Sequence, residues 1–127
     1  MGHLLRRKGV PVSGAIGSME RFLNVALANR NQQETVRESH LEFLRAGANV
    51  ITTNSYACVP SALALSPNSS PQLITDLIDA AGQIARQACQ LHVQELPLNS
   101  TVPMVAGCVP PLHESYRPDR VGSESEL

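Results

Sequence analysis

The chain has 127 residues, with ten Lys and Arg against eleven Asp and Glu, and a formal net charge of −1. It contains no Trp and only 3% aromatic residues, so it offers neither a basic field for a phosphate backbone nor a stacking surface for bases. These features argue against nucleic acid as a partner, and the length allows one domain with a single modest core.

The cysteines and the N-terminus indicate the compartment. Cys58, Cys89 and Cys108 are an odd number without a C-x-x-C pair, which argues against a disulfide framework and against a thiolate zinc site. No apolar run approaches the roughly 20 residues that cross a bilayer. The N-terminus, MGHLLRRKG, lacks the apolar core of a signal peptide. We therefore expect a cytoplasmic protein without a membrane partner.

The first predicted helix spans residues 18–28, with Ser18 as its N-cap. Its apolar side chains fall on one helical face: Met19, Phe22, Leu23 and Ala26. The polar run that starts at Asn29 breaks this pattern, so the helix is expected to end before it.

A second helix is predicted over residues 34–45, followed by a strand. Val36, His40, Phe43 and Leu44 share one face of this helix. Gly47 stands where a left-handed residue ends a helix. For His40, a core-facing imidazole is favoured over a catalytic role. Residues 49–53, NVITT, are apolar at successive positions and rich in β-branched side chains, which predicts a strand covered on both faces.

The longest predicted helix follows the polar break SPNSSP, at residues 66–71. An apolar stripe from Leu73 to Cys89 extends over about five turns. A loop then leads to VPMVAG, residues 102–107, a second short strand. Strand, crossover helix and strand form a βαβ unit with parallel strands, so the fold class is α/β.

Chemistry in parallel α/β folds gathers at the carboxyl ends of the strands. After the first strand come four side chains that can hydrogen-bond a small polar ligand: Thr53, Asn54, Ser55 and Tyr56. After the second come Cys108, His113, Glu114, Tyr116 and Arg117. A hydrogen-bond network at the strand end explains the first group equally well. For Cys108, a small buried residue is favoured over a place in a ligand pocket. For the charged loop that contains His113, Glu114 and Arg117, exposure to solvent is favoured over an acid or base role.

Two further patterns carry little functional weight. Cys89 and His92 lie three apart on a helix, but two ligands do not complete a tetrahedral metal site. GAIG, at residues 14–17, lacks the basic neighbours of a nucleotide clamp and the spacing of a dinucleotide fingerprint, which favours a turn.

Three segments together resemble one known family. They are MGHLLRRKGVP at residues 1–11, QETVRESHLEFLRAGANVITTNSYACVP at 33–60, and VAGCVPPLHESYRPD at 105–119. Their content and order are similar to those of the homocysteine S-methyltransferases, which are zinc-dependent (β/α)8 barrels. The resemblance implies the N-terminal part of a TIM-type barrel, with about two parallel strands and two to three helices. It also implies methyl transfer from an onium donor, such as S-methylmethionine or S-adenosylmethionine, to homocysteine, giving methionine.

Within this resemblance, Thr53, Asn54, Ser55, Tyr56 and Cys108 are the expected substrate-binding residues. Met1 and Gly2 match the end of a glycine-rich turn, which would put the first barrel strand and its substrate-binding aspartate before residue 1. In an alternative match, SGAIGSM at residues 13–19 is that turn and Ser13 replaces the aspartate.

A complete barrel takes roughly 250 residues, about twice the length of this chain. The three zinc-binding cysteines of relatives lie in later strands and have no counterpart here. We therefore expect no zinc bound by this chain, assign no catalytic or metal-binding residue, and expect little or no activity of the chain alone. Two interpretations fit the sequence. The chain is either a methyltransferase relative or a non-catalytic α/β fragment that binds a partner or a small molecule.

The domain assignment is one incomplete methyltransferase-like domain over residues 1–127, with a disordered tail at 119–127. Strands with open edges would favour self-association.

Overall fold

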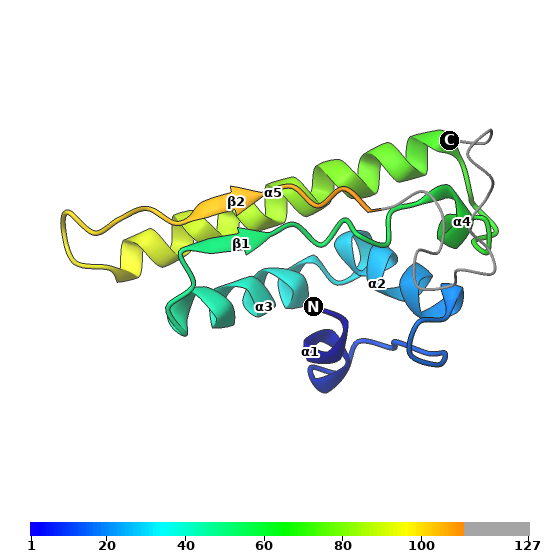
Figure 1. Cartoon of the computed structure of the whole chain (residues 1–127), viewed down its shortest axis with the longest axis horizontal. Coiled ribbons are helices and arrows are strands. Elements are labelled where there is room, and N and C mark those ends of the chain that lie inside the picture. Colours follow the sequence, from blue (N-terminus) through cyan, green and yellow to red (C-terminus); the bar gives the residue numbers. More distant parts are fainter. Residues whose placement is uncertain (111–127) are drawn as a thin grey trace, which may run out of the picture.

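Residues 1–110, which the computed structural model describes, contain five helices and two strands (Figure 1). The elements are α1 (Gly2–Arg7), α2 (Met19–Asn31), α3 (Gln33–Arg45), β1 (Val50–Thr52), α4 (Pro60–Leu63), α5 (Pro71–Glu95) and β2 (Met104–Ala106). The predicted α/β class is confirmed. Two short helices, α1 and α4, add to the three that the sequence predicted, because six and four residues are too few to show a helical period.

The two strands form a parallel sheet, as predicted. Val50 pairs with Met104, Ile51 with Val105 and Thr52 with Ala106. The long helix α5 connects the strands and lies along them, while α3 runs beneath β1 (Figure 1). The arrangement is the βαβ unit from which parallel barrels are built.

Helix α2 begins as expected but ends later. The Ser18 hydroxyl accepts a hydrogen bond from the Arg21 main-chain N–H at 3.2 Å, which confirms the N-cap. The predicted end before Asn29 was wrong, since the helix continues to Asn31. Asn29 is fully buried, and its side-chain amide donates to the carbonyl of Asn54 at 2.8 Å. The local pattern does not reveal this hydrogen-bond partner, because Asn54 lies 25 residues further along the chain.

The end of α3 sets the direction of β1. Gly47 has a φ of +99°, its N–H donates to the Leu44 carbonyl at 2.9 Å, and the Ala48 N–H donates to the Phe43 carbonyl at 3.0 Å. These two bonds make a Schellman motif, for which a glycine is the favoured left-handed residue. The predicted helix end at Gly47 is confirmed, and the chain enters β1 three residues later.

The helices bury one face of the sheet. Ile51 packs into a cluster formed by α3 and α5, with Leu41, Leu44, Ala85, Ala88 and Cys89. On the other face Val50 is 47% exposed and Met104 is 65% exposed. The prediction of strands covered on both faces was therefore wrong. Among residues 1–110 the helices cover only the face that carries Ile51, and the apolar run reflects a second face that these elements leave open.

No helix in residues 1–110 combines the length and the apolar content that crossing a membrane requires. The longest, α5, has 25 residues, and its buried side chains form a stripe along one face. The predictions for His113, Glu114, Tyr116, Arg117 and the tail at 119–127 concern residues outside those described.

Candidate functional site

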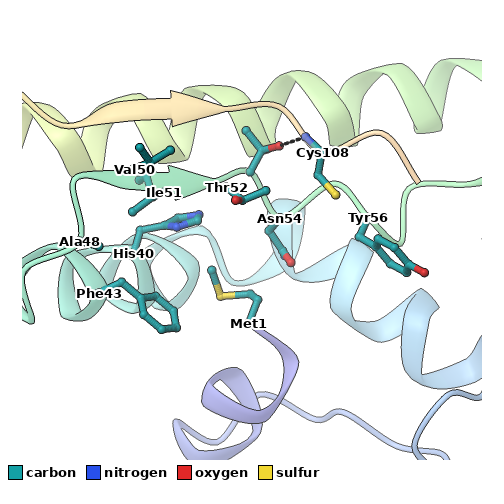
Figure 2. Close-up of a pocket in the computed structure, with 11 residues that line it drawn as sticks. Met1, His40, Phe43, Ala48, Val50, Ile51, Thr52, Asn54, Tyr56 and Cys108 are labelled. Atoms are coloured by element: carbon teal, nitrogen blue, oxygen red, sulfur yellow. Dashed lines mark hydrogen bonds between the residues drawn. The ribbon is translucent and has the colours of Figure 1, made fainter. Parts of the chain in front are cut away.

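A pocket of about 380 Å³ lies along β1 and around its carboxyl end (Figure 2). Four of the five predicted binding residues line it: Thr53, Asn54, Tyr56 and Cys108. Its other walls come from Met1, from His40 and Phe43 on α3, and from residues 48 and 50–52. The two strand ends therefore meet at one pocket, as expected for parallel strands. Ser55 is not among the residues that line this pocket.

Three of the predicted residues hold the two strand ends together. The Cys108 N–H donates to Thr53 Oγ1 at 3.1 Å, and the Ser55 hydroxyl donates to the Cys108 carbonyl at 3.0 Å. Thr53 Oγ1 and Ser55 Oγ are 2.8 Å apart and share a further hydrogen bond. The network continues the sheet by one step, because the Thr53 N–H donates to the Ala106 carbonyl at 2.9 Å. These hydroxyls fix the pocket wall rather than standing free.

Asn54 is tied to helix α2. Its side-chain N–H groups donate to Asn29 Oδ1 at 2.9 Å and to the Val25 carbonyl at 3.0 Å. Asn29 returns a bond to the Asn54 carbonyl and lies 3.4 Å from the Leu77 carbonyl on α5. Both amides are buried. This pair joins the end of β1 to two helices, and sequence reasoning missed Asn29 because its partner is 25 residues away.

Tyr56 is the most exposed of the five predicted residues. It is 41% exposed, and its ring packs edge-to-face on Phe22 with the ring centroids 5.9 Å apart. Within residues 1–110, no hydrogen bond engages its hydroxyl. A ligand can therefore hydrogen-bond this hydroxyl without displacing a partner among residues 1–110.

His40 also lines the pocket, and its predicted core-facing position is confirmed. Its side chain is 1% exposed, and its Nε2 atom has no hydrogen-bond partner among the described residues. Burial lowers the pKa of His40 to about 4, and the nearby positive charge of the N-terminus acts in the same direction. The imidazole is therefore neutral at pH 7. The only sequence signal for this group was its position on the apolar face of α3.

The cysteines do not form a metal site within residues 1–110. Burial raises the pKa of the Cys58 thiol to about 11 and also raises the pKa of the Cys89 thiol, so both are protonated at neutral pH. The two thiols lie in separate apolar clusters. No three His, Cys, Asp or Glu side chains in this range are arranged to hold a metal ion.

Replacing Thr53 with valine tests the wall of the pocket. The Cys108 N–H would lose its acceptor and Ser55 one of its partners, so we expect the free energy of unfolding to fall by about 1 kcal/mol. The amide of Cys108 should also exchange faster with solvent. The control is Thr52→Val at the neighbouring exposed position, which should change the stability by less than about 0.5 kcal/mol. Equal effects of the two changes would show that the network contributes nothing.

Three comparisons with known proteins agree with this architecture. A family model described as homocysteine S-methyltransferase matches residues 1–127. Betaine-homocysteine S-methyltransferase of Drosophila melanogaster is 30% identical over 80 residues, which are 61% of this chain and 24% of the fly protein. The crystal structure of the metallated homocysteine methyltransferase MmuM from Escherichia coli superimposes with a TM-score of 0.73 and 29% identity, over 87% of this chain and 35% of the bacterial chain.

The chain thus spans about a quarter of the length of the fly relative and about a third of the solved structure. The match of the family model, residues 1–127, includes the parallel βαβ unit and the strand ends that form the pocket. Since the family model matches from the first residue to the last, this chain belongs to the homocysteine S-methyltransferase family.

Proposed function

We propose that the chain takes part in methyl transfer to the sulfur of homocysteine, which gives methionine. In this proposal it supplies one wall of the pocket in which homocysteine binds. The observation that carries this proposal is the family match over residues 1–127, together with a pocket at the two strand ends. The donor would be an onium compound such as S-methylmethionine or S-adenosylmethionine.

The pocket wall offers an amino acid polar groups at the strand ends. The Tyr56 hydroxyl can donate or accept a hydrogen bond, and the Thr53–Ser55–Cys108 network keeps the strand ends at a fixed separation. In the transfer, a sulfur lone pair of homocysteine attacks the methyl carbon. The bond from that carbon to the onium atom breaks with its electron pair going to the leaving group, and the thiol proton is released.

The described residues do not activate this nucleophile. His40 is a weak base, with a pKa of about 4, and Cys58 and Cys89 are buried as neutral thiols in separate clusters. The donor set within residues 1–110 does not fit a zinc ion, so we assign no step to one. Residues 1–110 therefore account for binding and orientation rather than for ionising the thiol.

Homocysteine binding tests the proposal directly. Titrating millimolar homocysteine into the 127-residue chain should shift the NMR signals of Thr53, Tyr56 and Cys108, and Tyr56→Phe should weaken this response. Methionine, which carries no free thiol, serves as the comparison ligand. A spectrum unchanged by homocysteine would contradict the proposed pocket.

We also expect slow or absent turnover by the isolated chain. An unassisted thiol with a pKa near 8.5 is only about 3% ionised at pH 7, so the rate should be at least roughly 30-fold below that of an intact relative. Methionine formation from homocysteine and S-methylmethionine, with zinc present and the Escherichia coli enzyme as reference, measures this. Turnover at the rate of the reference enzyme would contradict the expectation.

The second candidate function is that of a non-catalytic α/β segment that associates with another polypeptide. The open edge of β1 favours it, because β1 pairs with β2 on one side only among the described residues. Binding of homocysteine and association through this edge can be measured separately.

A further inference from the structure

Arg21, in the first turn of α2, is a buried cation without a partner among the described residues. It is 6% exposed, and its Nη2 atom is buried and makes no hydrogen bond in this part of the chain. None of the ion pairs within residues 1–110 includes it. The guanidinium stays protonated at any physiological pH, so burial cannot neutralise it. A buried charge of this kind requires an anion.

The position of Arg21 on its helix adds to the need for negative charge. The Ser18 cap accepts its main-chain N–H, which places Arg21 at the start of α2. The helix dipole leaves a partial positive charge at this end, which opposes a cation and favours an anion. Glu20, the acidic residue of the same turn, is exposed, and adjacent residues of a helix do not face each other. Glu20 therefore does not supply the missing charge.

A second pocket, of about 290 Å³, lies beside Arg21 at the start of α2. Arg21 lines it together with apolar side chains from the loop before α2, from α2 and from the segment after β1: Ile16, Phe22, Val25 and Ala57. Asn54 and Tyr56 line both this pocket and the pocket at the strand ends, whereas Arg21 lines only this one. The second pocket therefore combines a buried cation with an apolar surface.

We propose that the second pocket binds a small monocarboxylate with a short apolar chain, whose carboxylate pairs with the Arg21 guanidinium. The planar guanidinium matches the two oxygens of a carboxylate. One positive charge balances one carboxylate, whereas a phosphate group carries more than one negative charge at neutral pH. The apolar side chains cover the chain of the ligand. This site goes beyond methyl transfer and does not depend on it.

Titration with sodium butyrate at constant ionic strength tests the site. In the 127-residue chain, the NMR signals of the Arg21 Nε–H group and of the Ile16 and Val25 amides should shift and saturate. Arg21→Met keeps an unbranched side chain without the charge. It should weaken butyrate binding by at least about tenfold, because a charge-assisted hydrogen bond is lost. Arg30→Met is the matched control, since Arg30 is exposed on the same helix, and it should keep the wild-type affinity.

Two comparison ligands and one further variant define the chemistry. Butylammonium has the same apolar chain and the opposite charge, so it should give no saturable shift. Inorganic phosphate should bind more weakly than butyrate, since it gains nothing from apolar walls. Arg21→Lys keeps the charge and loses the planar group, so its affinity for butyrate should lie between those of the wild type and Arg21→Met.

Four outcomes would overturn the proposal. The first is that butyrate gives no saturable shift in the wild type. The second is that Arg21→Met binds butyrate as tightly as the wild type does. The third is that phosphate or butylammonium binds at least as tightly as butyrate. The fourth is that butyrate binds only after the acidic side chains of residues 111–127 are replaced by amides, which would assign Arg21 to a carboxylate of the chain itself. Those side chains are Glu114, Asp119, Glu124 and Glu126.

The responses to butyrate and to homocysteine are read from different residues. Thr53 and Cys108 line only the pocket at the strand ends, and Arg21 and Ile16 line only the second pocket. Shifts at Thr53 and Cys108 with homocysteine therefore test the proposed function, and shifts at Arg21 and Ile16 with butyrate test the second pocket. Each response can be absent while the other is present.

Discussion

Replacing Asn29 with alanine should lower the free energy of unfolding by about 3 kcal/mol, because several buried polar groups would lose their partners at once. The Asn29 side chain donates to the Asn54 carbonyl and accepts from the Asn54 amide. Alanine supplies neither group, and it leaves a cavity where α2, α5 and the end of β1 meet. Each buried group left unpaired costs about 1–3 kcal/mol.

Urea unfolding of the wild type, Asn29→Ala, Asn54→Ala and the double variant measures both the loss and its origin. The two single changes should be non-additive, since both remove the hydrogen bond from the Asn54 side-chain amide to Asn29 Oδ1. Asn24→Ala is the matched control: Asn24 lies on the same helix, and its bonds to Ser13 and Glu20 are exposed. That change should cost less than about 0.5 kcal/mol. Additive effects of the Asn29 and Asn54 changes would contradict the pairing.

The sequence predicts the elements whose pattern is long enough to repeat. The apolar stripe from Leu73 to Cys89 and the helix that ends at Gly47 both repeat the helical period several times, and each is present. Parallel pairing of the strands follows from the length of the crossover helix between them. The helices α1 and α4 complete at most about two turns, so the chain shows no period there.

The site was predictable only in outline. The position of Thr53, Asn54, Tyr56 and Cys108 after two parallel strands was enough to bring them to one pocket. The direction of each side chain was not, because it depends on residues far along the chain: Asn54 turns to Asn29 on α2, and Ser55 turns to the Cys108 carbonyl. The β-branched residues of NVITT, at 49–53, likewise predict a buried strand, but they do not show which elements of the fold cover it.

The second large effect concerns pH. We expect the protein to lose about 2 kcal/mol of its free energy of unfolding between pH 7.5 and pH 5 through His40 alone. The pKa of His40 is about 4 in the folded protein and 6.5 in an unfolded chain. Between these two values the unfolded state binds the proton and the folded state does not, so stability falls as the pH falls. The contribution is fully present above pH 6.5 and reaches a total loss of about 3 kcal/mol below pH 4, at 1.36 kcal/mol per pKa unit.

Measuring urea unfolding at pH 7.5 and pH 5 in the wild type and in His40→Leu isolates the contribution of His40 to the free energy of unfolding. The variant cannot titrate at this position, so its loss over the same interval should be smaller by about 2 kcal/mol. His3→Leu makes the same substitution at an exposed position and serves as the control variant. The pKa of Glu95 is lowered by its hydrogen bond to Arg45, so its effect begins only below its ordinary value of 4.5, outside this interval. Equal losses in wild type and His40→Leu would mean that the imidazole accepts its proton in the folded protein, which its burial beside the N-terminal charge opposes.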